Sequence, residues 1–327
     1  SENAKEAEYE IFTQDGFLVT KKDIKEINLP LFYYDNPRHS SGVKSVFVVN
    51  DEYFALISSK KISCLYASLI NLKNAKEVIK SDCLPDEELA DFDALGGAYS
   101  KINNGILLTI GVPTHKSEII AQLSQLDSSI FGKILFISDK SILNNENEKV
   151  EYSIFSSGHR NPQGLFYDKE QNFIISTEHG PMGGDEINLN ISPEKKIKNY
   201  GWPVASYGEH YSILKGKNNP INKEKYKKYP LLKSHSKNGF EEPIKYYVPS
   251  VAISQIIKIG DVKKNVFLVT SLKAKTIFII ELDENFKLIS EKKFYIGERV
   301  RDAITTPGNK KIILFLENSP SLAILEK

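Results

Sequence analysis

The chain of 327 residues is long enough for one large domain or two ordinary ones, and it can bury a sizeable core. Hydrophobic residues make up 41% and charged residues 26%, which excludes global disorder, a collagen and a coiled coil. The formal net charge of +1 gives the molecule no overall basic field. Nucleic acid is therefore not an expected partner.

No apolar run approaches the roughly 20 residues that a membrane helix needs, so we expect no integral membrane segment. The polar start, Ser1–Glu10, has no signal-peptide pattern. That leaves either a cytosolic protein or one whose targeting segment has been removed. The two cysteines, Cys64 and Cys83, are too few for a zinc site by themselves. They form either one disulfide in an oxidising compartment or two buried thiols.

Short runs of β-branched and aromatic residues alternate along the chain with clusters of Gly, Asn, Asp and Pro, which is typical of strands joined by turns. Two apolar runs around a polar turn recur at Val46–Ser58, Ala98–Ile110, Gly164–Thr177, Thr276–Ile289 and Asp302–Leu316. Similar hairpins spread over a whole chain favour a radial repeat over a sandwich. The pattern predicts an all-β fold, a six-bladed β-propeller with about 54 residues in each blade.

Few segments depart from this pattern. Lys116–Leu126 predicts one short helix. Gly208–Phe240 is rich in Lys, Asn, Tyr and Ser and poor in periodic apolar residues, so we expect a long ordered loop there. Ser321–Lys327 is a candidate to pair with an N-terminal strand and close the ring. We therefore expect a single domain over residues 1–327, with a loop insertion around 208–240.

The segment GPMGGDE, residues 180–186, carries the first candidate site. Its glycines and proline force an irregular backbone that exposes the carbonyl oxygens of Gly180 and Pro181 beside the carboxylate of Asp185. Two carbonyls and a carboxylate are hard oxygen ligands that suit Ca²⁺, although the spacing is not that of an EF-hand. A tight turn with a capping aspartate is the alternative.

Two further clusters are rich in hydrogen-bond donors. Arg160, Asn161 and Gln163 lie in one loop, where the planar guanidinium suits a carboxylate or another polarised oxygen. A structural arginine paired with a blade carboxylate is the alternative there.

The second donor cluster lies near the C-terminus. Lys273 follows a predicted strand, and Arg299 and Arg301 alternate, so their side chains share one strand face. Two like charges on one face repel each other unless an anion lies between them. The alternative is a solvated edge on which Glu298 and Asp302 are the partners.

The order of these motifs resembles one family. GHRNPQG, EHGPMGGDEINL, NYGWP, SLK and RVRD follow one another as in the soluble PQQ-dependent aldose sugar dehydrogenases, also called the glucose/sorbosone dehydrogenase family. The clear match runs from about Ser153 to Leu325, roughly half of the chain. The N-terminal half matches weakly. The resemblance implies a six-bladed β-propeller, in agreement with the hairpins.

The resemblance also implies cofactors and site residues. PQQ would lie over the central channel with Ca²⁺ beneath the quinone, and a sugar would be the small-molecule substrate. Gly180, Pro181 and Asp185 would hold the metal, and Arg160 would approach the quinone oxygens as a catalytic residue. The remaining cofactor contacts implied by the motif match are Asn161, Gln163, His179, Ser250, Lys273, Arg299 and Arg301.

The implied activity is oxidation of an aldose sugar or related alcohol by hydride transfer to the quinone. Three cations and Ca²⁺ complement the tricarboxylate cofactor. Family members are typically periplasmic or secreted, and we expect the same of this chain.

The substrate side departs from the family. A family histidine that takes the hydroxyl proton precedes a Gly-Gly or Ser-Gly pair, where this chain has Asp93 or Ala94 depending on the register. The family aspartate that supports this histidine is Val112 here. Asp93 is a candidate substitute base, and His115, ahead of His39, is another. A base typically contributes about 10²–10⁴-fold to the rate.

Two other functions stay open. A family member that has lost catalysis would be a ligand- or partner-binding propeller, which the missing proton-transfer pair favours. A lactonase-like hydrolase on a Ca²⁺ propeller is the third, but it gives no role to Lys273, Arg299 and Arg301. The fold alone does not decide among them.

Overall fold

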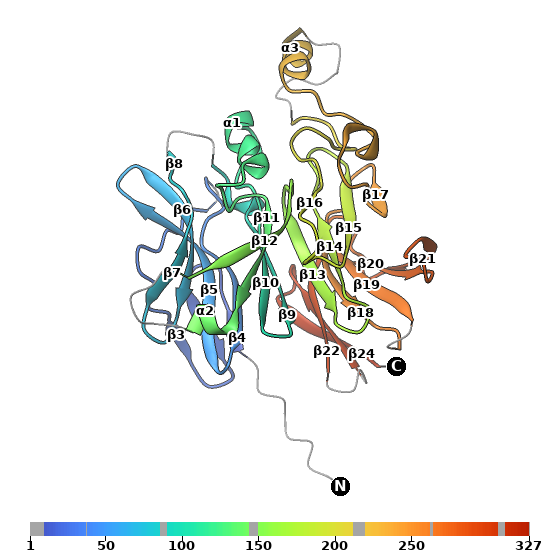
Figure 1. Cartoon of the computed structure of the whole chain (residues 1–327). Helices are drawn as coiled ribbons and strands as arrows, with labels where there is room; N and C mark the ends of the chain where they lie inside the picture. Colours follow the sequence, from blue (N-terminus) through green and yellow to red (C-terminus); the bar gives the residue numbers. More distant parts are fainter. Residues whose placement is uncertain are drawn as a thin grey trace.

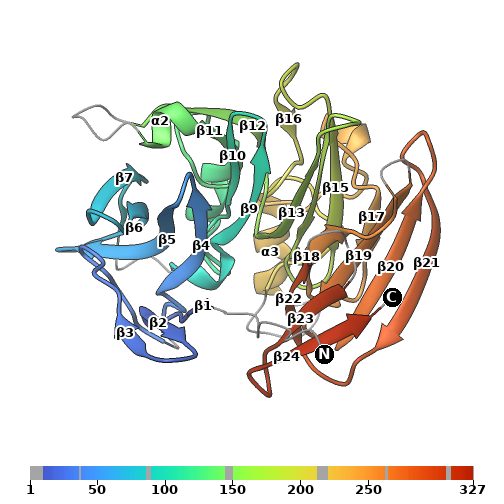
Figure 2. The ribbon, with the colours of Figure 1, turned by 90° about the horizontal axis from the view of Figure 1, so that it is seen from below.

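The computed structural model describes residues 10–36, 38–85, 90–143, 150–211, 220–261, 264–306 and 311–326. These residues form six small sheets arranged around a central axis, which confirms the predicted six-bladed β-propeller (Figures 1 and 2). Apart from one parallel pair, all neighbouring strands in these sheets are antiparallel, as expected for consecutive hairpins.

The N-terminal half of the chain supplies three blades. The first is small and holds β1 (Glu10–Phe12), β2 (Phe17–Thr20) and β3 (Ile24–Glu26). The second holds β4 (Val43–Val49), β5 (Glu52–Lys61), β6 (Cys64–Asn71), β7 (Lys76–Lys80) and β8 (Leu84–Pro85). The third holds β9 (Gly96–Ile102), β10 (Gly105–Ile110), β11 (Lys133–Ser138), β12 (Tyr152–Ser157) and the later strand β16 (Lys198–Asn199).

The other three blades follow in chain order. The fourth holds β13 (Pro162–Asp168), β14 (Phe173–Glu178), β15 (Asp185–Ile191) and β17 (Lys245–Tyr247). The fifth holds β18 (Ile253–Lys258), β19 (Asn265–Ser271), β20 (Thr276–Leu282) and β21 (Leu288–Tyr295). The sixth holds β22 (Val300–Thr305), β23 (Lys311–Leu316) and β24 (Ser321–Glu326).

The first strand of each large blade lies toward the axis. Figure 2 shows β4, β9, β13, β18 and β22 around the middle of the molecule, and β9, β13, β18 and β22 pack against one another in that order. Loops that precede or follow these strands therefore meet over the channel.

All five predicted hairpins form. In the first of them, β4 and β5 join through Asn50 and Asp51, whose φ angles of 45° and 66° lie in the left-handed region that Asn and Asp tolerate. Side chains of neighbouring blades then pack against one another, as Phe47 of β4 and Tyr99 of β9 do at a ring-centroid distance of 5.2 Å and Phe173 of β14 and Phe267 of β19 do at 6.3 Å. This burial between blades supplies the main stabilisation of the ring.

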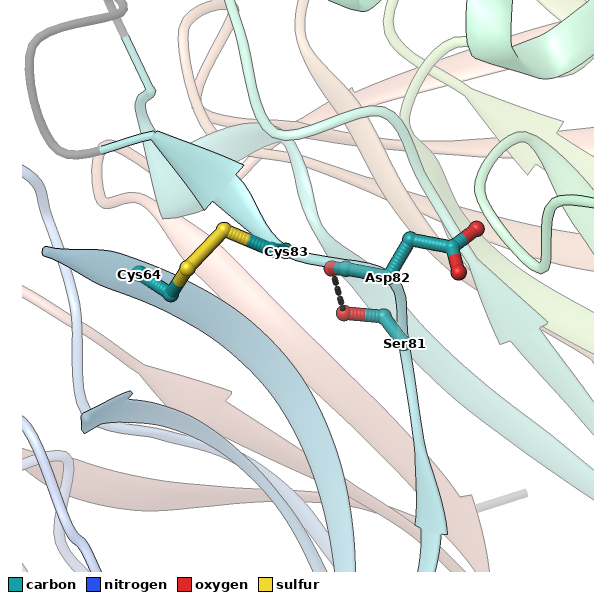
Figure 3. Close-up of a disulfide and its surroundings, with 4 residues drawn as sticks. All are labelled: Cys64, Ser81, Asp82 and Cys83. Atoms are coloured by element: carbon teal, nitrogen blue, oxygen red, sulfur yellow. Dashed lines mark hydrogen bonds between the residues drawn. A yellow bond between two sulfur atoms is a disulfide. The ribbon is translucent and has the colours of Figure 1, made fainter. Parts of the chain in front are cut away.

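Cys64 and Cys83 form a disulfide with a Cα–Cα distance of 5.2 Å (Figure 3). The bond joins the start of β6 to the segment after β7, so it ties together parts of one blade that are 19 residues apart. Of the two states that the sequence left open, the structure shows the disulfide.

The predicted helix at Lys116–Leu126 appears as α1 (Glu118–Ala121), followed by a 3₁₀ turn at Gln122–Gln125. A second short helix, α2 (Asp139–Leu143), follows β11. The range 208–240 was expected to be a loop, and the structure corrects this in part. It contains α3 (Pro220–Lys228), on the same side of the propeller as α1 (Figure 1), while residues 212–219 lie outside the described ranges.

The predicted ring closure by the last strand is not observed. Within the described ranges, β24 pairs with β23 alone, and β1 pairs with β2. The sixth blade therefore packs against the fifth through β22 and β18 without sharing a strand with the N-terminal blade. In the part of the chain that the structure describes, no helix has the length and apolar character needed to cross a bilayer.

Candidate active site

The turn that precedes β9 contains Asp93 and Ala94, the two residues between which the sequence left the family's histidine position open. Phe92–Ala94 is a 3₁₀ turn capped by Asp91, whose carboxylate accepts the Asp93 backbone N–H at 3.1 Å. Phe92 and Ala94 are fully buried, whereas 66% of the Asp93 side chain is exposed. Asp93 therefore lies at the solvent-facing side of this turn, and Ala94 is part of the core.

His115 lies beside this turn, in the loop between β10 and α1. Its Nε2 is 3.6 Å from Asp91 Oδ2 and 3.7 Å from Asp93 Oδ2. Its Nδ1 accepts a hydrogen bond from the Arg160 guanidinium at 2.6 Å. The His115 imidazole holds the pKa of Asp93 well below its usual range, so Asp93 is ionised and weakly basic.

Arg160 joins His115 to the predicted metal loop. Its buried guanidinium also donates to the backbone carbonyls of His179 at 2.9 Å and Gly180 at 2.7 Å. The rings of Trp202 and Tyr211 lie 5.4 and 5.7 Å from it, within the range of cation–π contacts. Because this packing excludes water from the guanidinium, its hydrogen bonds are electrostatically stronger than they would be in water.

A small pocket opens beside these residues. It has about 10 Å³ of water-accessible volume and is lined by His115, Arg160, Pro181, Trp202 and Tyr211, among others. Tyr211 meets the His115 ring edge-on at a centroid distance of 5.6 Å. The pocket therefore brings the His115 imidazole and the predicted metal loop to one place.

The carboxylate of Asp185 is fully buried and holds the loop that leads into the fifth blade. It accepts hydrogen bonds from Ser250 Oγ at 2.7 Å, from Val251 N at 3.0 Å and from Ala252 N at 2.6 Å. Gly184, with φ of 71°, lets the backbone of Gly208 approach the metal loop, since a Cβ there would lie 2.2 Å from Gly208 N. Ser250 thus contacts the predicted metal ligand.

The donor set fits a hard cation such as Ca²⁺. Within the ranges that the structure describes, Asp185 Oδ1 accepts from Ser250 alone and the Gly180 carbonyl from Arg160 alone, so each oxygen keeps a lone pair. Among the described residues, no group of three or more acidic, histidine or cysteine side chains is arranged to hold a metal ion, so a metal here would depend on backbone carbonyls.

Two buried nitrogens fit a polar ligand in the same place. Arg160 Nε and His179 Nε2 have no hydrogen-bond partner within the described part of the chain. Buried polar atoms nearly always have a hydrogen-bond partner. A bound group with its own donors and acceptors would supply the partners that these two nitrogens lack. Burial lowers the pKa of His179, which leaves its imidazole neutral.

A chain of hydrogen bonds crosses the channel from the sixth blade to the third. Arg301 donates to Gln163 Oε1 at 3.3 Å, and Gln163 donates to Asn161 Oδ1 at 2.7 Å. Asn161 in turn donates to the backbone carbonyl of Asp93 at 3.2 Å. The structure therefore brings together predicted cofactor residues that are distant in the chain, such as Arg301 and Gln163, which lie 138 positions apart.

The C-terminal cations are arranged differently from the sequence prediction. Arg299 and Arg301 both pair with Glu317, Arg301 at 2.6 Å. The partners named from the sequence are wrong, because Glu298 accepts from Ser319 N and Asp302 accepts from Gln255. Lys273 is exposed, and no ion pair joins its ammonium to another described residue.

Sequence reasoning missed two charged residues at this site. The hairpin register was the available signal for Glu317, because Val300 pairs with Leu316 and the next pair outward is Arg299 and Glu317. Lys44, on β4, donates to the Ser40 carbonyl at 2.5 Å, and burial lowers its pKa to about 8 against the opposing effect of Asp93 and Asp91. No sequence motif marks Lys44.

The remaining positions of the substrate-side prediction lie elsewhere. Val112 is fully buried in a hydrophobic cluster. This position is therefore part of the core and does not face an open site. His39 is buried, and its Nδ1 lies 2.8 Å from the Tyr33 hydroxyl and 3.4 Å from Asp35. His115 is therefore the histidine that faces Asp93.

Two curated proteins resemble more than half of this chain. It is 30% identical over 205 residues to the aldose sugar dehydrogenase YliI of Escherichia coli, which covers 58% of this chain and 50% of that protein. It is 30% identical over 231 residues to quinoprotein glucose dehydrogenase B of Acinetobacter calcoaceticus, with 56% and 47% covered. The chain thus spans about half the length of these relatives.

Solved structures show the same fold. The soluble aldose sugar dehydrogenase of Escherichia coli in its apo form superposes with a TM-score of 0.71 at 21% identity, covering 97% of this chain and 92% of that one. The PQQ-bound aldose sugar dehydrogenase of Streptomyces coelicolor superposes with a TM-score of 0.58 at 18% identity, covering 98% and 90%. The family model for glucose/sorbosone dehydrogenase matches residues 99–324, more than half of the sequence. The chain belongs to the glucose/sorbosone dehydrogenase family.

Proposed function

We propose that this protein is a PQQ- and Ca²⁺-dependent dehydrogenase that oxidises a hydroxyl group of an aldose sugar or a related alcohol. One observation carries the proposal. His115, Arg160 and the carbonyl of Gly180 form one continuous hydrogen-bonded group beside a pocket, and Arg301, Gln163 and Asn161 extend it across the channel. Family membership and the relatives named above support the same class of reaction.

The residues that would hold the cofactors follow from their chemistry. Gly180, Pro181 and Asp185 offer oxygens to Ca²⁺, and Arg160 and His179 have unpaired nitrogens for polar groups of the quinone. When bound, PQQ would accept a hydride from the carbinol carbon, with Ca²⁺ polarising the quinone carbonyl. Oxidation of an alcohol to a carbonyl also releases the hydroxyl proton, which this chain must accept.

His115 is better placed than Asp93 to take this proton. Asp93 is held ionised with a lowered pKa, which makes it a weak base. The Nδ1 lone pair of His115 would receive the proton once Arg160 turns from it. Asp91 and Asp93, near Nε2, would then stabilise the imidazolium, as a carboxylate does for a catalytic histidine.

The proposal extends to the compartment. The Cys64–Cys83 disulfide supports an oxidising environment, which agrees with a periplasmic or secreted protein. A propeller that has lost catalysis and only binds a ligand has less support, because His115 occupies the place next to Asp93 that a base requires and the named relatives are dehydrogenases.

Dye reduction tests this function. The purified protein is loaded with PQQ in excess Ca²⁺, its cofactor occupancy is measured by absorbance, and it is offered a panel of aldoses with an artificial electron acceptor. We expect dye reduction with at least one sugar, and loss of that activity when Ca²⁺ is chelated. Full occupancy with no dye reduction by any sugar would reject a dehydrogenase and leave a binding propeller.

A further inference from the structure

A carboxylate of the chain itself lies between the two arginines of the sixth blade. Arg299 donates through Nε to one oxygen of Glu317, and Arg301 donates through NH2 to the other oxygen at 2.6 Å. The backbone reinforces the arrangement, because Glu317 N donates to the Arg299 carbonyl at 2.8 Å. All three side chains are about one-third exposed, so a ligand can reach them.

The bridging carboxylate reduces the electrostatic repulsion between the two neighbouring guanidiniums. A carboxylate that bridges two arginines neutralises one of the two charges and uses the planar donor edges that suit a ligand carboxylate. Arg301 lowers the pKa of Glu317, and Arg299 adds to that effect, so the bridge is ionised at neutral pH. An incoming carboxylate therefore meets an occupied anion site.

We propose that Glu317 is an internal competitor for this anion site, and that it sets the affinity of the propeller for anionic ligands by having to yield the arginines to them. The proposal rests on the proposed function for the identity of the ligand, the tricarboxylate PQQ. A ligand carboxylate would take over Arg299 and Arg301, and Glu317 would turn toward solvent.

Arg301 connects Glu317 to the centre of the site. The same guanidinium donates through NH1 to Gln163, and Gln163 is linked through Asn161 to the turn that carries Asp93. Release of Glu317 frees one edge of Arg301 while its other edge keeps the contact with Gln163. Glu317 is thus a specificity-determining residue and does not need to touch the reacting atoms.

The test compares PQQ binding by wild type, Glu317→Gln and Glu298→Gln in excess Ca²⁺, measured by calorimetry and by absorbance. Glu298 is the matched control, because it lies in the same region and accepts from Ser319 N without pairing to either arginine. We expect Glu317→Gln to bind PQQ about tenfold tighter or more, since like charges facing each other across a binding site are strongly unfavourable. Glu298→Gln should bind as wild type does.

The other outcomes are equally decisive. Equal affinity for wild type and Glu317→Gln, or weaker binding by the variant, would overturn the proposal and leave the proposed function standing. Binding by Glu317→Gln alone would support the competitor and refute PQQ use by the wild type. No binding by either protein would refute both. Glu317→Asp, which keeps the charge, should resemble wild type, and circular dichroism establishes that each variant is folded.

Discussion

At the scale of single residues, His115 is the group to which the proposed function assigns the hydroxyl proton. It lies between the guanidinium of Arg160 and the carboxylates of Asp91 and Asp93, so both of its nitrogens have a defined neighbour. The sequence could name His115 as a candidate because it follows the strand next to the missing family histidine. It ranked His115 ahead of His39 but could not show the contact with Arg160, which lies 45 positions away in the chain.

We expect His115→Gln to lower kcat/KM for sugar oxidation by about 10²–10⁴-fold, the usual contribution of a positioned base. His39→Gln is the control, because the His39 side chain pairs with Tyr33 and Asp35, and its contact with the Asp93 turn is through its backbone carbonyl, which the substitution keeps. Both variants are compared with wild type at equal PQQ occupancy and equal folded concentration. Unchanged turnover in His115→Gln, or an equal loss in His39→Gln, would remove His115 from the mechanism.

At the scale of elements, the hairpins were predictable because alternating apolar residues and Asn/Asp turns are local signals. The helix α3 was not, because its sequence PINKEKYKK has no apolar stripe to mark it. Glu317 shows the intermediate case. Its hairpin was predicted, but its role depends on a register that a bulge between Val300 and Asp302 shifts by one residue.

At this scale, the Cys64–Cys83 disulfide allows a prediction about the stability of the fold. It closes a loop with a sequence separation of 19 residues, so it restricts the unfolded chain. We expect the double variant Cys64→Ser/Cys83→Ser to lose about 3 kcal/mol of unfolding free energy, measured by urea denaturation. Wild type treated with a reductant serves as the chemical control and should lose a similar amount. A variant as stable as oxidised wild type would show that the bond adds nothing to this blade.

At the scale of the whole molecule, the propeller brings into one place residues that the sequence scatters over most of its length. Asp93, Arg160, Asp185 and Arg301 come from the turns and strands of different blades. The motif order made this convergence predictable for the residues that the resemblance covers. Lys44 was not predictable, because its position depends on how the blades face one another. The partner of Arg299 lies within the same blade, so it depended on the hairpin register instead.

The central claim is that this channel binds PQQ with the help of Ca²⁺, and a calorimetric titration of the wild-type protein with PQQ tests it most directly. The titration is performed once in excess Ca²⁺ and once with Ca²⁺ removed by a chelator. We predict near-stoichiometric binding in the first buffer and a large loss of affinity in the second, since the oxygens of Gly180, Pro181 and Asp185 would hold the metal under the quinone. Absence of binding in both buffers would contradict the account.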